Sequence, residues 1–502
     1  MERVLTVIVA LVVVVALGLN LFLFAQNQDL RRRIAAIPPT PPAPSQDQIA
    51  KLQELTSELD QYKKDFSKIS AEVRKLREQD AGLASAATER DALKVQVEQL
   101  HAENTQLKNQ VLNLQTMNGI NGQVATLRGL SPRATVPRTF MNQAQLHDYF
   151  TASFEKDYTP AAETQERTVL RALDMDSGEP SLRAAQIDAL TRSVLGFYSQ
   201  ENKQLVVVTN RPQMGVKDRI TYAHEFTHSL QDQYYDLTAL FKQATSNSDR
   251  RAAIQALVEG DATLTMSLYA QKYLDAIDKV NYRLELMSDL DPYSAFANRG
   301  GPMTESATYF PYQEGESFVA DMYGLGGWKQ VDAMFARPPR STEQVLHPEK
   351  FVAGDEPVAV ALPNLAAALD GWNLVAEDTL GELYTRIYLE HALPLETAIP
   401  AGEGWGGDRY QVLQDGQGHT ALALRSAWDS PEDASEFFAA YSKFVLKIGG
   451  SDISVLHADA DHARWQLAGR QVYLSRVGSQ VLVLHAADGP TLDRMLAQFR
   501  GM

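Results

Sequence analysis

The sequence predicts an α+β protein with three parts in chain order. The first part is a transmembrane helix followed by a coiled coil, the second is a mainly helical domain with a small β-sheet, and the third is a small α+β domain. Three observations support this prediction. They are an apolar run at residues 4–24, apolar residues spaced three and four apart over residues 49–117, and mixed helix and strand patterns from residue 139 onward. At 502 residues the chain has room for about three such units.

The apolar run at residues 4–24 is long enough, as a helix, to span the roughly 30 Å hydrocarbon core of a bilayer. We therefore predict a single-pass membrane anchor, with its flanks, over residues 1–33. The alternative is a cleaved signal peptide, in which Ala16 and Gly18 form a small-x-small cleavage site. The anchor is favoured because the apolar residues continue past that site to Phe24.

The charges around this run bear on its orientation. Arg31, Arg32 and Arg33 follow it and favour a cytoplasmic location for what comes next, whereas Arg3 precedes it. N-terminal anchors nevertheless most often export the chain that follows them. We therefore expect the main part of the protein to be extracytoplasmic, although charge counting does not support this orientation.

A proline-rich spacer at residues 34–48 separates this run from a predicted coiled coil at residues 49–117. The heptad pattern slips between Asp80 and Arg90, which divides the coiled coil into two blocks. In the second block Asn104 occupies a core position that is otherwise valine, a pattern typical of a parallel dimer with fixed register. We predict a parallel homodimer. The alternative is one long helix that packs on the globular part.

The overall composition excludes several classes of protein and of site. The net charge of −16 and the pI near 5.2 argue against nucleic-acid binding, because such proteins present a basic surface to the phosphates. The chain contains no cysteine, so disulfides, thiolate catalysis and cysteine-based zinc sites are excluded. Any metal must be bound by His, Asp or Glu.

The segment TYAHEFTHSL at residues 221–230 contains an HExxH motif. On a helix, His224 and His228 are four residues apart and share one face, so both imidazoles can bind one ion at about 2.0–2.1 Å. Glu225 lies beside them, in a position to take a proton from water without binding the metal. A glycine-rich linker at residues 118–138 and a predicted hairpin, 194–198 with 205–209, precede this helix.

Two histidines leave a zinc ion under-coordinated, so a third ligand is needed. Glu259 lies in the segment ALVEGDA, on another predicted helix with apolar surroundings. A carboxylate in such a place is better suited to a metal than to solvent. Gln231 and Tyr234 exclude the longer HExxHxxGxxH pattern of the metzincins.

The residues His224, Glu225, His228 and Glu259, with Gly260 and Ala262 after the last, resemble the gluzincin metallopeptidases. The resemblance covers roughly residues 194–348. It implies a zincin-like fold for a domain at residues 139–375, with Zn²⁺ bound by His224, His228 and Glu259. It also implies Glu225 as the general base and a peptide or protein substrate lying along the 205–209 strand as an edge.

A gluzincin also needs a donor that stabilises the oxyanion. His347, in TEQVLHPEKF, is favoured slightly over Tyr312, in FPYQEG. His347 is alternatively a histidine that caps a helix end, and Tyr312 an ordinary core residue. Asp232, four residues after His228, is a candidate to orient an imidazole, or else a solvated helix charge.

The resulting prediction is a membrane-anchored, zinc-dependent peptidase that uses Glu-assisted attack of water. The alternative is an inactive membrane scaffold or peptide-binding module with a gluzincin-like domain. An intact Glu225 argues against this alternative. The α+β C-terminal domain at residues 376–502 has no predicted function.

Overall fold

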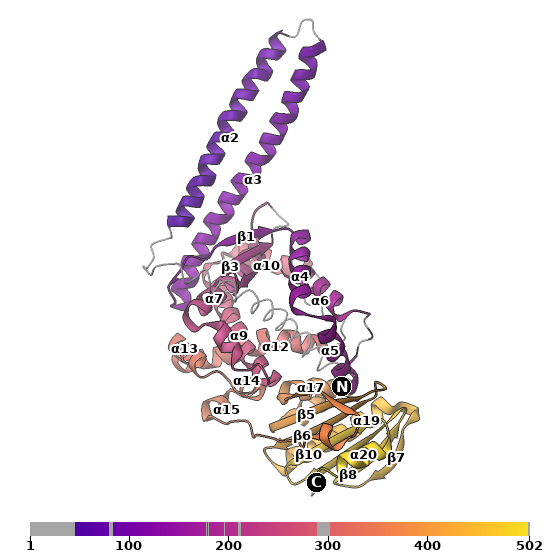
Figure 1. Ribbon diagram of the computed structural model, residues 1–502. Coiled ribbons are helices and arrows are strands. Elements are labelled where there is room, and N and C mark those ends of the chain that lie inside the picture. Colours follow the sequence, from indigo (N-terminus) through magenta and orange to yellow (C-terminus); the bar gives the residue numbers. More distant parts are fainter. Residues whose placement is uncertain are drawn as a thin grey trace.

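The computed structural model describes residues 46–79, 84–176, 178, 180–194, 196–208, 212–288 and 302–499. These residues form three parts that follow one another along the molecule (Figure 1). A long pair of helices, here called the arm, projects from a helical domain that carries a small sheet. A second domain, built on a large sheet and called the sheet domain, lies at the opposite end.

The arm consists of α2 (Gln46–Gln79) and α3 (Ala84–Arg128), which lie side by side (Figure 1). Leu55 and Leu59 of α2 are buried, and Phe66 contacts His101 of α3 with ring centroids 5.9 Å apart. The seam that we assigned to a parallel homodimer is thus occupied within one chain. A heptad repeat requires an apolar partner helix but does not say whether that helix comes from the same chain. A dimer through this seam would require the arm to open.

Helix α3 continues to Arg128, through the first half of the segment that we expected to be a linker. Met117, Ile120 and Val124 extend its apolar face and pack against α7 in the helical domain. Gly119 and Gly122 lie on the exposed face, where they do not interrupt the helix. The helix ends at Gly129, whose φ of 76° lies in the left-handed region that favours glycine.

The small sheet has the strand order β1 (Arg138–Met141), β3 (Gln204–Val208), β2 (Gly196–Ser199). β3 pairs in parallel with β1 and antiparallel with β2, so it is the central strand. Our expectation that residues 205–209 form an edge for a peptide was wrong. β1 lies more than 60 residues earlier in the chain, and the sequence does not reveal that it pairs with β3. The edges are β1 and β2.

Side chains alternate between the two faces of the small sheet, and each face packs against helices. One face carries Val206 and Phe197 towards α4 and α6, and the other carries Leu205 and Tyr198 towards α3 and α7. The helices of this domain are α4 (Gln143–Asp157), α5 (Pro160–Ala172), α6 (Leu182–Ser193), α7 (Val216–Tyr235), α8 (Leu237–Lys242), α9 (Ser248–Tyr273), α10 (Ala276–Ser288), α12 (Pro302–Gly326), α13 (Trp328–Ala336), α14 (Thr342–Leu346) and α15 (Pro348–Ala353).

Helices α9 and α12 cross at unusually short range. A Cβ added to Gly260 of α9 would lie 2.1 Å from the carbonyl oxygen of Gly315 in α12, and one added to Gly315 would lie 2.4 Å from that of Ala256. Backbone therefore packs directly on backbone at this crossing, which only glycine permits. The crossing brings α12 next to Glu259, the residue before Gly260.

The sheet domain contains seven strands in the order β4-β5-β6-β10-β9-β8-β7, with every neighbouring pair antiparallel. Helix α19 covers one face through Phe437 and Phe444, and α20 covers the other through Leu492. The first of these faces belongs to a core that continues into the helical domain. The elements are α16 (Leu365–Ala368), β4 (Trp372–Asp378), α17 (Gly381–Glu390), α18 (Leu395–Ala398), β5 (Trp405–Asp415), β6 (Thr420–Trp428), α19 (Pro431–Gly449), β7 (Ser454–Ala458), β8 (His462–Leu467), β9 (Arg470–Val477), β10 (Gln480–Ala486) and α20 (Gly489–Leu496).

Two parts of the predicted fold class need correction. The C-terminal domain, which we predicted to be a small α+β unit, is built on a large sheet of seven strands. The edge strand β7 was missed because all five of its residues are exposed and it lacks the alternation of a half-buried strand. In addition, β4 begins at Trp372, so the sheet domain starts slightly before residue 376.

The prediction of a transmembrane helix, and of a membrane-anchored protein with an extracytoplasmic main part, is also corrected. Within the described ranges no helix is long and apolar enough to cross a bilayer. The two longest helices, α2 and α3, carry charged residues along their length. Residues 4–24, on which the prediction depended, lie outside the described residues, as does the proline-rich spacer up to residue 45.

Substitution of Gly260 should force α9 and α12 apart where their backbones are in contact. We expect Gly260→Ala to lower the free energy of unfolding by about 1–3 kcal/mol, the usual cost of overpacking a core. The matched control is Gly122→Ala, where the added Cβ would have nothing within 4 Å. This change should stabilise α3 by about 0.5–1 kcal/mol, because alanine favours a helix over glycine. Urea unfolding of the full chain measures both, and equal stability of Gly260→Ala and wild type would contradict the crossing.

Candidate metal centre

The two histidines of the HExxH motif lie one turn apart on α7. The Nε2 atoms of His224 and His228 are 3.0 Å from each other, and the two rings meet edge to face at 86°. The face they share is turned towards α9. Their side chains are only 9% and 12% exposed.

Glu259 completes this group from α9. Its Oε2 lies 3.1 Å from Nε2 of His224 and 3.2 Å from Nε2 of His228. Three potential ligand atoms from two helices thus form a nearly equilateral triangle. Among the described residues, this is the one group of three or more His, Asp or Glu side chains with its ligand atoms close enough to hold one metal ion.

The triangle agrees with what zinc requires. Ligand atoms bound tetrahedrally at about 2.0–2.1 Å are separated by about 3.3 Å, close to the 3.0–3.2 Å found here. Two imidazole nitrogens and one carboxylate oxygen are also a usual donor set for catalytic zinc, which leaves one position open. The residues present therefore fit a zinc ion.

The electrostatics of the triangle also favour a cation. Burial by itself would raise the pKa of Glu259, but the two neighbouring imidazoles outweigh it and hold the pKa well below its usual range. The carboxylate is therefore charged although it lies away from water. A buried anion of this kind needs a positive partner, which a protonated imidazole or a metal ion can provide.

Glu225 lies next to the triangle and is held by the small sheet. Its Oε2 accepts a hydrogen bond of 2.9 Å from the backbone N–H of Tyr198 in the edge strand β2. Withdrawal of the carboxylate from water raises its pKa, although both imidazoles oppose the shift. A raised pKa makes Glu225 a stronger proton acceptor than an exposed glutamate.

Asp232 does not orient an imidazole, as we had considered. It accepts hydrogen bonds from the Tyr198 hydroxyl at 2.8 Å and from Nζ of Lys203 at 2.5 Å. Asp232 therefore fastens the β2–β3 hairpin to α7, and so supports the strand that holds Glu225. The side chain that does contact an imidazole is Gln231, with Oε1 2.8 Å from Nδ1 of His228. Its i, i+3 spacing was visible in the sequence, but we used Gln231 only to exclude a metzincin.

The structure brings Tyr312, rather than His347, next to the triangle. Tyr312 lies on α12 with its ring centroid 6.0 Å from that of His224. His347 ends α14, and its Nε2 lies 2.9 Å from Oε1 of Glu382 in α17.

The surroundings of His347 place it away from the metal centre. Thr342, in the same short helix, donates to Asp249 in the first turn of α9. That turn is about 15 Å along the helix axis from Glu259. His347 thus belongs to the packing between α14 and α17, and the structure does not bring it to the metal centre.

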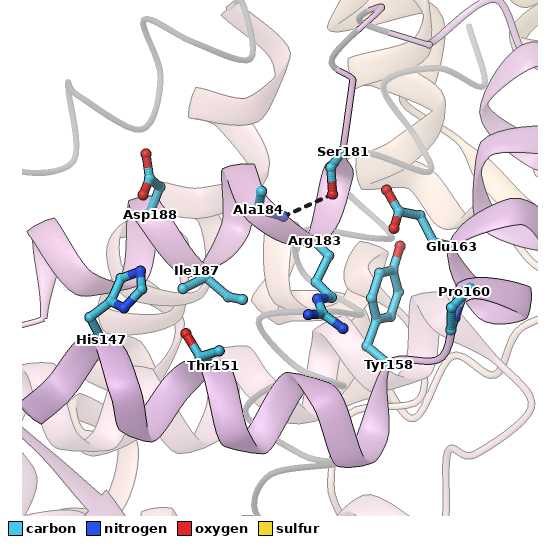
Figure 2. A pocket seen from close by; sticks show the side chains of 10 residues that line it. All are labelled: His147, Thr151, Tyr158, Pro160, Glu163, Ser181, Arg183, Ala184, Ile187 and Asp188. Carbon is cyan, nitrogen blue, oxygen red and sulfur yellow. Dashed lines mark hydrogen bonds between the residues drawn. The ribbon is translucent and has the colours of Figure 1, made fainter.

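A cavity of about 470 Å³ lies between α4, α5 and α6 (Figure 2). It contains none of the metal-centre residues. Its charged groups are engaged in helix packing: Glu163 accepts from the backbone N–H of Leu182, and Arg183 lies 3.6 Å from Glu155. We assign no function to this cavity.

Comparison with known proteins adds little on function. Residues 371–496 match a domain family of unknown function, DUF8575. The match coincides with the sheet domain and does not include the metal centre. No curated protein and no solved structure matches the chain.

The metal centre predicts a specific pattern of zinc binding. The full chain should bind one zinc ion, and zinc at a hundred times its Kd should stabilise it by about 2.7 kcal/mol. His228→Ala and Glu259→Gln should lose both effects, whereas His347→Gln, outside the triangle, should retain them. Elemental analysis and thermal unfolding measure this. Equal losses in all three variants would contradict the assignment.

Proposed function

We propose that this protein is a zinc-dependent peptidase. The observation that carries the proposal is the buried triangle of His224, His228 and Glu259, with Glu225 fixed beside it by a backbone hydrogen bond. A structural zinc site normally has four protein ligands. The present group offers three, with an acidic side chain next to them, which favours a catalytic role.

A zinc ion bound here would act as a Lewis acid and lower the pKa of water towards neutrality. The part played by the chain itself is proton transfer. Tyr198 holds Oε2 of Glu225 in place, which leaves Oε1 to accept the proton from the attacking water. Glu225 then returns this proton to the leaving nitrogen of the substrate.

The proposed substrate is a peptide or protein in extended conformation. β2 is an edge strand of the small sheet, and its backbone at Tyr198 reaches the catalytic carboxylate. A peptide aligned with such an edge forms main-chain hydrogen bonds that do not depend on its sequence. The outward amide at Tyr198 is already bound to Glu225, so a peptide at β2 would pair with the remaining outward backbone groups of the strand, which would place a peptide bond near Glu225.

Tyr312 is the proposed donor to the oxyanion. It lies on α12, which the Gly260–Gly315 crossing brings against the ligand helix α9. A phenol hydroxyl can donate to a carbonyl oxygen as negative charge develops on it. The position of Tyr312 beside His224 supports this role.

Removal of the base should abolish turnover but not metal binding. We expect Glu225→Gln to lower kcat for casein and for a mixed peptide library by at least about 10²–10⁴-fold, the usual contribution of a general base. Its zinc content should equal that of wild type, because Glu225 is not a ligand. If wild type binds zinc but cleaves no peptide, the protein is a binding module and the peptidase proposal fails.

Replacement of the two candidate oxyanion donors distinguishes between them. Tyr312→Phe should lower kcat by about 10²–10³-fold with little change in KM, because it removes a hydrogen bond formed in the transition state. His347→Gln should leave kcat close to that of wild type. The reverse order of effects would show that His347, not Tyr312, acts on the substrate.

A further inference from the structure

The arm ends near the metal centre and is connected to it by polar contacts. Arg128, the last residue of α3, is fully buried and contacts Asp261, which in turn contacts Gln231, the partner of His228. We propose that Gln231, Asp261 and Arg128 are positioning residues for His228, so that the arm helps to build the metal centre. This inference rests on the proposed zinc-dependent function.

The side-chain amide of Gln231 is held in one orientation by its neighbours. Its Nε2 faces two acceptors, the carbonyl of Val258 at 2.8 Å and Oδ2 of Asp261 at 2.9 Å. An amide nitrogen can donate to both, whereas an amide oxygen in that place would face only acceptors. These contacts therefore set the orientation of the amide and direct Oε1 towards Nδ1 of His228.

Gln231 determines which ring nitrogen of His228 carries the hydrogen. Because Oε1 of Gln231 is only an acceptor, Nδ1 of His228 must carry the hydrogen in their 2.8 Å contact. In the neutral ring Nε2 then presents its lone pair to the triangle, as metal binding requires. Nδ1 of His224 has no such partner in the described part of the chain. His228 is thus the ligand whose ring is fixed by side chains.

The negative charge of Asp261 is balanced by Arg128. Arg128 donates to it through two nitrogens, Nε to Oδ1 at 2.6 Å and Nη2 to Oδ2 at 3.2 Å. Both side chains are completely buried, so each charge depends on the other. The forked contact also fixes the plane of the carboxylate, which fixes the acceptor for Gln231.

Arg128 is itself held in place by the helical domain. Its Nη1 donates to Asp332 at 2.8 Å, and the guanidinium stacks 4.4 Å from the ring centre of Trp328. The same helix forms one half of the arm. Four consecutive polar contacts therefore connect α13, the base of the arm, α9 and the metal ligand His228.

The test compares zinc binding by full-length wild type, Gln231→Met and Asp261→Asn. Gln231→Met keeps the length of the side chain but removes the acceptor for His228. We expect zinc to bind about 10–100-fold more weakly to both variants, the usual effect of losing a partner that orients a ligand. The matched control is Thr227→Val, since Thr227 is equally buried on α7 and its hydroxyl bonds only within the helix, to Ala223.

Two readouts separate positioning from general destabilisation. Competition with a chromophoric chelator measures the Kd for zinc, and the visible absorption of the cobalt-substituted protein reports the ligand geometry. The variants should change both, and Thr227→Val should match wild type even if it lowers Tm. Arg128→Lys keeps the positive charge but cannot donate two parallel hydrogen bonds to Asp261. Its Kd for zinc should lie between those of wild type and Gln231→Met.

The outcomes are distinguishable from failure of the proposed function. If wild type binds zinc and Gln231→Met binds it equally, with an unchanged cobalt spectrum, the positioning role is wrong and the metal centre stands. If Thr227→Val weakens zinc binding as much as Gln231→Met does, the positioning role is also wrong. The loss would then follow from the removal of any buried polar group in α7. If wild type binds no zinc, both proposals fail.

Discussion

Convergence of three buried ligand atoms from α7 and α9 is the constraint on which the rest of the site depends. A charged Glu259 that lies 3.1–3.2 Å from two imidazole nitrogens, and away from water, needs positive charge beside it, from a protonated imidazole or a bound metal ion. The site requires α9 to pack closely on α12. Gly260, the residue after Glu259, allows this because it has no side chain. The same glycine admits α12, which brings Tyr312 to the ring of His224.

Helix α7 is held from two sides by parts of the chain that are distant in sequence. On one side β2 binds it twice, through the backbone of Tyr198 to Glu225 and through the Tyr198 hydroxyl to Asp232. On the other side the end of the arm reaches it through Asp261 and Gln231. The first support fixes the proposed base Glu225 and the second fixes the proposed ligand His228, so the sheet and the arm support different residues of one site.

The part of the site that was predictable from sequence is the part encoded locally. His224 and His228 share a helix face whatever the tertiary fold, and Glu259 stands out as a carboxylate among apolar residues. The sequence favoured His347 slightly over Tyr312 on no firm ground, because the positions of both depend on how α12 and α14 pack on α9. Gln231 looks like any polar helix residue until Asp261 is placed beside it. The pairing of α2 with α3 could not be predicted, because a heptad pattern is the same for a hairpin within one chain and for a dimer.

The most direct measurement of the central claim is X-ray absorption at the zinc edge on the full-length protein loaded with one equivalent of zinc. We expect about four nitrogen or oxygen ligands at about 2.0–2.1 Å, two of them with the multiple-scattering signal of imidazole. We also expect Glu225→Gln to leave this spectrum unchanged. A spectrum with one imidazole or none, or a shell of about six oxygen ligands, would contradict the assignment of His224, His228 and Glu259 as an open zinc site.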